Sequence, residues 1–468
     1  PEGHVPFKRK LAWTAGILVM YFFLTNITMF GLATGGAEGD FYGRFRSILA
    51  GSQGSILQLG IGPIVTASIV LQLLGGADLL GLDTDDPRDQ ILYQGLQKLL
   101  VVVMICLTGL PMVFAGNYLP VDTQLGASLG IGGGGMRTLL FAQMFVGGIL
   151  ILFMDEVISK WGVGSGIGLF IIAGVSQQLV AGLFAVPALG TQVTGFFPAW
   201  YGIITGSIQL DPFVQSLLFD PGNILALFTT VLIFAIVVYT ESVRIEIPLS
   251  HARVKGARGR FPVKLIYASV LPMILVRALQ ANIQFLGQIL NNYVTLPSIV
   301  GVYSQGQPVS GLFYYLAPIQ SRQDWMWFSG AFTVSAEPWQ IVLRVLVDLT
   351  FMIVGGAIFA VFWVETTGMG PESTAQQIQN SGMQIPGFRK NPQVIEKVME
   401  RYIPQVTVIG GALVGLLAVL ANMLGTLGGV SGTGLLLTVS ITYKLYEEIA
   451  EEQLMEMHPM MRSMFGSD

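Results

Sequence analysis

Acidic side chains are the residues of this chain that could do chemistry, and their placement argues against an enzyme. Five acids fall in or beside apolar runs, mostly near the ends of those runs: Asp155, Glu156, Glu241, Asp348 and Glu365. No HExxH pattern places two histidines and a glutamate on one helix, as a zinc protease would require. We therefore expect a protein that is not an enzyme.

Metal ligands and redox residues are equally sparse. The three histidines, His4, His251 and His458, are scattered along the chain and do not form a metal-ligand pattern. The single cysteine, Cys106, excludes an intrachain disulfide and fits an apolar position. The glycine run WGVGSGIG at 161–168 does not match the dinucleotide pattern GxGxxG and favours close helix packing. We expect no metal and no cofactor.

The stretch 51–76, AGSQGSILQLGIGPIVTASIVLQLLG, is more informative. It is apolar and about long enough to cross a bilayer, but Gly54, Gly60, Gly62 and Pro63 interrupt it. Backbone groups freed by such a break cannot face lipid, so they must be buried in protein or line a water-filled cavity. The break therefore indicates a pathway through a membrane protein.

The composition agrees with a membrane protein, because 52% of the residues are hydrophobic and only 11% are charged. A soluble domain has about 25% charged residues. Apolar runs of spanning length predict ten transmembrane helices. These runs lie at about 11–31, 61–76, 96–116, 137–158, 165–186, 223–243, 264–285, 340–363, 404–424 and 432–449. The first run is long, lacks a small-residue cleavage site and is followed by nine more spans, so we do not interpret it as a cleavable signal peptide.

The distribution of Lys and Arg predicts the orientation. If the N-terminus is cytoplasmic, eighteen of these residues lie in cytoplasmic segments and four lie outside. Such an excess is typical of cytoplasmic loops. We expect both termini in the cytoplasm and the protein in a cell membrane.

Ten spans divide into two halves of five, and an odd number makes the halves antiparallel in the membrane. Inverted repeats of this kind usually place a pathway at their interface. We predict an all-α polytopic fold with two inverted five-helix halves around a central pore. The predicted parts are an N-terminal half at 1–222, a C-terminal half at 223–449 and a cytoplasmic tail at 450–468.

Two cytoplasmic loops, at about 245–264 and 365–403, carry clusters of cations. The segment HARVKGARGRFPVK at 251–264 has five Lys and Arg residues and no acid. The segment GFRKNPQVIEKVMER at 387–401 adds four more around a short helix that we expect to start after Pro392. The orientation bias alone could explain these charges. Alternatively, they form a docking surface for a polyanion, either lipid head groups or structured RNA.

Motifs along nearly the whole chain resemble those of the SecY family, the pore-forming subunits of the Sec protein translocon, in its archaeal and eukaryotic branch. They occur in family order: LGIGPIVTA at 59–67, DEVISKWGVGSGIGLFI at 155–171, RIEIPL and HARVKG at 244–256, ANIQ at 281–284, FWVETTG at 362–368, GFRK at 387–390, RYIP at 401–404 and GTGLLLTVSITYKLYE at 432–447.

The resemblance implies an hourglass pore closed at its waist by a ring of apolar side chains. Such a constriction can exclude ions by dewetting and still admit a passing chain. By motif matching, the ring residues are Ile61, Val65, Ile167, Ile171, Ile274 and Leu437.

The resemblance also implies a plug and a lateral gate. The plug is a short helix at about 47–58 that blocks the pore from outside, with Ile48, Leu49, Ile56 and Leu57 as its apolar residues. The gate opens to lipid between the second and third spans on one side and the seventh and eighth on the other. The polar residues expected to hold it shut are Thr66, Thr108 and Asn282. We expect Arg277 in the outer aqueous funnel, because facing lipid would be costly.

Partners follow from the same resemblance. The basic loops would dock the ribosome through Arg253, Lys255, Arg258, Arg389 and Lys390. Two small membrane subunits, of the SecE (gamma) type and the small beta type, would clamp the halves. Signal sequences, nascent polypeptides and membrane lipid are the other expected partners, and the location implied is the archaeal cell membrane.

Two further hypotheses remain open from the residues. An inverted-repeat secondary transporter of a small solute would share the ten-span topology. A structural scaffold for membrane insertion would need neither ring nor plug. The resemblance favours a channel that translocates unfolded secretory polypeptides and releases hydrophobic segments into lipid.

Overall fold

The structure is a computed structural model of the 468-residue chain. It describes residues 6–31, 55–76, 87–114, 121–186, 195–210, 213–219, 222–251, 258–264, 271–304, 307–329, 336–366, 370–380, 383–384 and 392–457.

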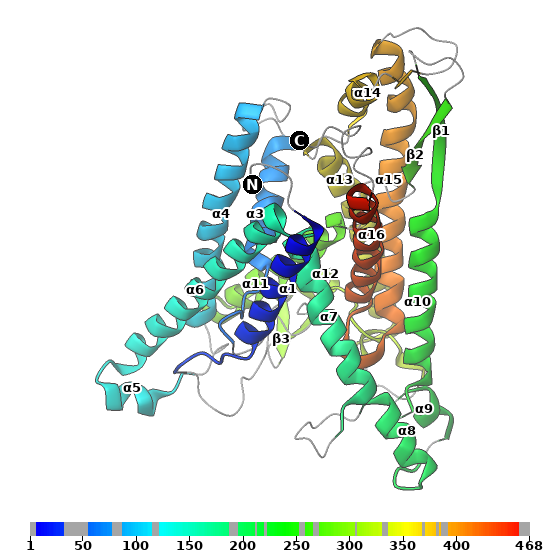
Figure 1. The fold of residues 1–468 in the computed structure, drawn as a ribbon. Helices are drawn as coiled ribbons and strands as arrows, with labels where there is room; N and C mark the ends of the chain where they lie inside the picture. The colour runs from blue at the N-terminus through cyan, green and yellow to red at the C-terminus, as the bar shows by residue number, and fades with distance from the viewer. Residues whose placement is uncertain are drawn as a thin grey trace.

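Helices occupy all ten predicted spans (Figure 1). Seven of the described helices are long and apolar enough to cross a membrane, and the second predicted span is a shorter apolar helix. The first and last of the ten carry charged residues at one end. The ten are α1 (Phe7–Thr25), α3 (Gly62–Gly76), α4 (Pro87–Phe114), α6 (Gly132–Trp161), α7 (Gly166–Phe184), α10 (Ile224–Ser242), α11 (Leu271–Tyr293), α13 (Pro338–Thr366), α15 (Pro392–Leu424) and α16 (Gly432–Met457).

Several helices extend beyond their apolar runs. Helix α4 begins nine residues before the predicted start at 96, and α16 continues into the predicted tail as far as Met457. The short helix expected after Pro392 is not separate, because α15 runs unbroken from Pro392 through Pro404 to Leu424. These extensions are polar, so hydropathy alone does not reveal them.

Strands occur only in the connections between spans among the described residues. Strand β1 (Arg244–His251) pairs antiparallel with β2 (Arg258–Lys264), from Arg244 opposite Lys264 to Ser250 opposite Arg258. Strand β5 (Met383–Gln384) adds to the other edge of β1, so the sheet order is β2-β1-β5. The membrane part of the fold is helical, as predicted, while the first basic loop is a β-hairpin.

Short elements gather at the opposite end from this sheet (Figure 1). Strands β3 and β4 form a separate antiparallel pair there, in the long connection between α11 and α13. The remaining elements are α5 (Thr123–Leu129), α8 (Phe196–Ile204), α9 (Phe213–Leu218), β3 (Val302–Ser304), β4 (Gln307–Ser310), α12 (Leu312–Leu316), the 3-10 turns Arg322–Asp324, Trp327–Ser329 and Leu427–Gly429, and, beside β5, α14 (Pro371–Asn380).

The two ends of the described chain lie on the same side of the helices (Figure 1). Lys10, at the start of α1, donates a hydrogen bond to Glu452, near the end of α16, with 2.7 Å between Nζ and Oε1. An even number of spans has this result. Both ends therefore point the same way, as predicted from the span count.

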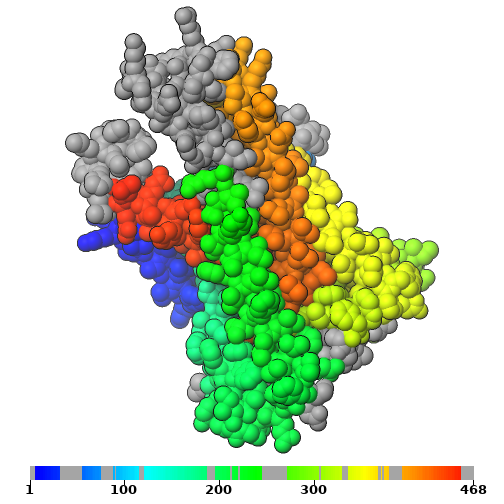
Figure 2. Space-filling view, turned by 90° about the vertical axis from the view of Figure 1, so that its right-hand side faces the viewer, coloured from blue at the N-terminus to red at the C-terminus, as the bar shows by residue number. Residues whose placement is uncertain are grey.

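One apolar cluster runs through the centre of the helix bundle and includes side chains from both halves of the chain. Among the seven long apolar helices, α11 is the most enclosed: 67% of the residues in its most apolar stretch are buried, against 28% for α13. The outer helices instead expose large apolar side chains such as Phe153, Val231 and Phe234. On the face shown in Figure 2, α10 and α15 lie side by side. A bundle that exposes apolar faces in this way suits a lipid environment.

The glycine run at 161–168 is the turn between α6 and α7. Ser165 caps α7, because its Oγ accepts a hydrogen bond from the backbone N–H of Gly168 at 3.2 Å. Such a cap satisfies one of the otherwise unpaired N–H groups of a helix start. The run therefore has a structural use, consistent with the interpretation that it is not a dinucleotide site.

Candidate functional site

The break predicted within 51–76 is present as a series of turns from Ser55 to Ile61 that leads into α3. Gly60 adopts a φ of 56°, in the left-handed region that suits glycine. Pro63 lies in the first turn of α3, where its missing N–H costs nothing. The break is thus encoded locally, by a glycine that turns the chain and a proline that starts the helix.

These turns are buried inside the bundle. The N–H of Ile56 donates to the carbonyl of Ile27 at 3.2 Å, and the Leu57 side chain belongs to the central apolar cluster. Helix α6 approaches so closely that a Cβ on Gly147 would clash with the carbonyl oxygen of Ile56. The freed backbone therefore faces protein and not lipid, as the bilayer requires.

The predicted plug is described only in part. Ile48 and Leu49 lie outside the described residues, while Ile56 and Leu57 lie in the buried turns. The described portion of the plug, 55–58, is a set of turns and not a helix. What the structure places against the core is therefore the C-terminal end of the predicted segment.

The six predicted ring residues come from four elements of both halves. Ile61 directly precedes α3 and Val65 lies in its first turn, Ile167 and Ile171 lie on α7, Ile274 lies on α11 and Leu437 lies on α16. Five of them are at most 2% exposed and Ile167 packs against them, so all six share the central apolar cluster. The spacing of four residues within α7 keeps its two isoleucines on one face.

A cavity of about 230 Å³ adjoins this cluster. Three of the predicted ring residues, Val65, Ile167 and Ile274, line it together with polar side chains of α3 and α4 and with Thr366 at the end of α13, where the second basic loop begins. The cavity therefore lies between the cluster and the end of the molecule that bears the β1–β2 hairpin. Its position matches a funnel above a constriction.

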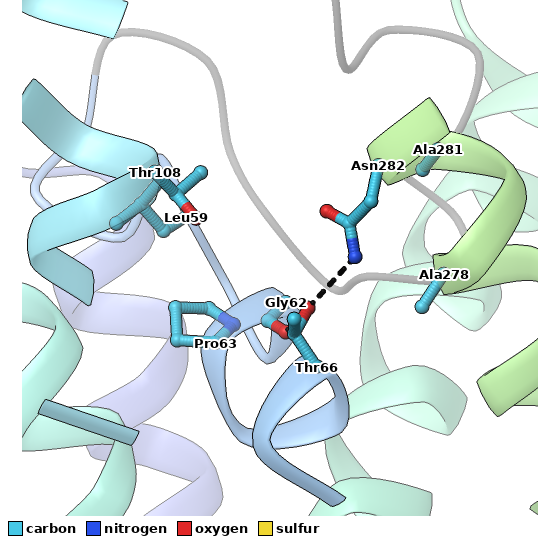
Figure 3. A pocket seen from close by; sticks show the side chains of 8 residues that line it. All are labelled: Leu59, Gly62, Pro63, Thr66, Thr108, Ala278, Ala281 and Asn282. Carbon is cyan, nitrogen blue, oxygen red and sulfur yellow. Dashed lines mark hydrogen bonds between the residues drawn. The ribbon is translucent and has the colours of Figure 1, made fainter. Parts of the chain in front are cut away.

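The three predicted gate residues lie around one small pocket, shown in Figure 3. Asn282 on α11 points at Thr66 on α3, and its Nδ2 donates a hydrogen bond to Thr66 Oγ1 at 3.1 Å. Thr108 on α4 lines the same pocket from the other side. The pocket measures about 10 Å³, close to the size that holds one water molecule. The seam between the halves is thus narrow and polar at this point.

Arg277 does not lie in an outer aqueous funnel, and that expectation is wrong. Its side chain is completely buried, with Nη1 3.5 Å from Oδ1 of Asp348 on α13. Gln280 and Thr433 accept further hydrogen bonds from the guanidinium. Both charges lie in predicted spans, but the sequence does not indicate that they pair, because they are 71 residues apart.

Four of the five predicted docking residues lie outside the described residues: Arg253, Lys255, Arg389 and Lys390. The fifth, Arg258, is the first residue of β2. The backbone nonetheless brings the two basic loops together, because β5 of the second loop pairs with Ser250 and His251 of the first. The sequence alone did not indicate this pairing.

One serine lies in a sequence with the spacing of a hydrolase motif. Residues 126–130, GASLG, have the spacing GxSxG of a hydrolase nucleophile. Ser128 lies in the seven-residue helix α5 and donates to the carbonyl of Leu125, two features of an ordinary helical serine. The hydrolase motif instead needs a strand that turns sharply into a helix, so GASLG gives no reason to propose an enzyme.

These features together define a polytopic membrane channel subunit, with an apolar cluster shared by two halves and a polar seam between them. Comparison with known protein families identifies it further. The SecY family matches residues 55–446, and the plug domain of Sec61p matches residues 19–54. The chain therefore belongs to the SecY family, with a plug domain, and is a protein-conducting channel subunit of the translocon.

Individual relatives support the same family assignment. The protein translocase subunit SecY of Haloferax volcanii is 76% identical over 474 residues, covering 100% of this chain and 96% of the relative. A solved structure of a protein-conducting channel superposes with a TM-score of 0.79 at 38% identity, covering 98% of this chain and 95% of that one. Sec61 in the canine ribosome-channel complex superposes with a TM-score of 0.76, also at 38% identity, with the same coverage.

Membership of this family confirms three predictions: the fold class, the channel function and the absence of enzymatic activity. It also favours the channel over the solute transporter. The predicted positions of ring, plug, gate and docking residues remain predictions.

Proposed function

We propose that the ring formed by Ile61, Val65, Ile167, Ile171, Ile274 and Leu437 is the constriction through which unfolded secretory polypeptides cross the membrane. The observation that carries this proposal is the shared apolar cluster, which draws one wall from each half of the chain. An apolar waist opposes the passage of ions because water is unfavourable there. A peptide segment displaces that barrier by widening the ring.

The pocket of Thr66, Thr108 and Asn282 is the lateral gate in this proposal. It lies where α3 meets α11, and so at a boundary between the two halves. Hydrogen bonds between membrane helices are worth about 0.6 kcal/mol on average. A single bond of this strength closes the seam but yields to a hydrophobic segment that leaves the pore for lipid.

The plug of the proposal is the segment at about 47–58, held in place through its end. Ile56 and Leu57 anchor that end in the cluster that contains the ring. The match of residues 19–54 to a plug domain supports a plug in this part of the chain, although the two ranges overlap only at 47–54. Displacing residues 47–54 would clear the pore while the buried turns stay packed.

The two basic loops form one docking surface for ribosomal RNA. The pairing of β5 with β1 supports a joint surface, because it holds the loop of Arg389 and Lys390 against the hairpin of Arg253, Lys255 and Arg258. Phosphate groups attract such cations regardless of base sequence. A ribosome-bound relative supports the choice of RNA over lipid head groups as the polyanion.

Two small membrane subunits, of the SecE (gamma) type and the beta type, complete the channel. The exposed apolar faces of the outer helices leave room for them. Both termini lie in the cytoplasm in this proposal, and the Lys10–Glu452 contact supports a common side for them. Similarity to a haloarchaeal relative supports the archaeal cell membrane as the location.

Reconstitution into liposomes tests the proposal. Channels with their small subunits should protect a ribosome-bound or signal-bearing polypeptide from added protease, because the polypeptide enters the lumen. The same liposomes should not accumulate a solute against an ion gradient. Solute accumulation without polypeptide protection would overturn the proposal.

A further inference from the structure

A buried ion pair lies beside the proposed ring and takes no part in the function described so far. Arg277 on α11 is 0% exposed and Asp348 on α13 is 2% exposed. Arg277 Nη1 also donates to Gln280 Oε1 at 2.8 Å, and Nε donates to Thr433 Oγ1 on α16 at 3.2 Å. The guanidinium therefore links three helices of the C-terminal half.

The carboxylate of Asp348 is better satisfied than the guanidinium. Its Oδ1 accepts a hydrogen bond from Gln280 Nε2 at 3.1 Å, and its Oδ2 accepts one from the backbone N–H of Ile319 at 3.2 Å. Arg277 Nη2, in contrast, has no hydrogen-bond partner among the described residues. A buried guanidinium with an unused donor depends heavily on the opposite charge that Asp348 provides.

Arg277 occupies a particular place around the axis of α11. Residues three apart on an α-helix are separated by about 60° around the axis, and residues eight apart by about 80°. Arg277 and Asn282 therefore lie on opposite sides of Ile274. A turn of α11 by about 60° in one sense would point Arg277 in the direction that Ile274 now faces, about 4.5 Å further along the axis, and carry Asn282 away from Thr66.

We propose that Arg277 is a selectivity-determining residue of the open pore, and that Asp348 keeps it out of the closed one. The inference rests on the proposed ring at Ile274. When α11 turns and the gate bond breaks, the guanidinium leaves Asp348 and enters the water of the pore. A fixed positive charge there attracts anions and repels cations. The closed state is favoured because the pair is intact only in it.

Selectivity of the opened pore gives the first test. Single channels are opened with a synthetic signal peptide under a KCl gradient, and the reversal potential is measured. Wild type should favour chloride, and Arg277→Gln should lose that preference. Arg344→Gln is the matched control, because Arg344 is also buried on α13 but binds the carbonyls of Ala317 and Pro318. Equal reversal potentials in wild type and Arg277→Gln would overturn the proposal.

Leak through the resting channel gives the second test. Asp348→Asn leaves the guanidinium unpaired in the closed state only, so ion leak should rise on the order of tenfold or more. Adding Arg277→Gln removes the unpaired charge, and leak should return close to the wild-type level. A double variant that leaks as much as Asp348→Asn would show that the leak comes from loosened packing. That result would overturn the proposed role of the ion pair in keeping the channel closed.

The proposed ring has its own test, which separates the two failures. If polar substitutions in the ring raise leak but the Arg277 and Asp348 variants behave as wild type, only the present inference fails. If the ring substitutions have no effect either, the position of the pore itself is wrong.

Discussion

Asn282 on α11 and Thr66 on α3 are joined by a hydrogen bond of 3.1 Å that crosses from one half of the chain to the other. Thr66 donates its own hydroxyl hydrogen to the carbonyl of Gly62 on its helix at 2.8 Å, so its oxygen is free to accept from Asn282. Thr108 lines the same pocket on the neighbouring α4. The seam is thus held by a side-chain pair that can separate without unfolding either helix.

The gate bond predicts a small, measurable coupling. Thr66→Val and Asn282→Leu should each favour lateral opening by about threefold, the equivalent of about 0.6 kcal/mol. The double variant should add little to either single one, because both remove the same bond. Signal-peptide concentration at half-maximal channel opening measures the effect. Thr229→Val is the control, because Thr229 is buried on α10 and its hydroxyl donates to the carbonyl of Leu225 on its own helix. Additive effects of Thr66→Val and Asn282→Leu would argue against the bond as the latch.

Deleting the plug should open a leak without unfolding the protein. Removal of residues 47–54 spares the buried turns at Ile56 and Leu57, so the ten helices should keep their thermal stability. Conductance of reconstituted resting channels should rise, because nothing then covers the ring. Unchanged conductance, with correct assembly shown by size-exclusion chromatography, would count against this plug position.

Polar substitutions in the ring should wet the constriction. Replacing Ile61, Ile167 and Ile274 together with Ser should increase the leak of small ions, because the apolar barrier to water is removed. The matched control replaces Ile105, Ile151 and Ile233, which are buried in the same cluster but were not predicted to belong to the ring. If both triple variants leak equally in planar bilayers, the ring has been placed wrongly.

Charge reversal in the basic loops should weaken ribosome binding and leave conductance unchanged. Replacing Arg253, Lys255, Arg258 and Arg389 with Glu removes phosphate contacts and adds repulsion. About four such contacts also predict that wild-type affinity falls on the order of 100-fold between about 50 and 200 mM salt. Co-sedimentation with ribosomes across a salt series measures both effects.

The control for this experiment reverses Lys8 and Arg9, which are exposed at the same end of the molecule. These residues should change ribosome binding little. A loop variant that sediments with ribosomes like wild type would remove the two loops from the docking surface.

Much of the fold could be predicted from the sequence, because bilayer thickness fixes the length of an apolar span. The predicted second span, 61–76, agrees with α3 (Gly62–Gly76) within one residue. The start of α15 at Pro392 could not be predicted this way, since its first turns are amphipathic and Pro404 stays within the helix. Hydropathy identifies the part of a helix that lipid covers and does not show where the helix continues into water.

Less of the candidate site than of the fold could be predicted from the sequence. Thr66 and Asn282 are 216 residues apart, and only the family resemblance suggested that they meet. No pattern in the sequence indicated that Arg277 would find Asp348, because pairing across helices depends on how α11 is turned about its axis. Isoleucines in a ring are likewise indistinguishable in sequence from isoleucines that merely pack.

The most direct test of the central claim is to trap a polypeptide inside the channel. Single cysteines at Ile61, Ile274 or the exposed Phe234 on α10 are introduced into a Cys106→Ser background, and a cysteine-bearing precursor is stalled by a folded C-terminal domain. Disulfide formation with the precursor is then measured by gel mobility. The account predicts crosslinks at positions 61 and 274 and none at 234. Crosslinks at 234 without any at 61 or 274 would contradict it.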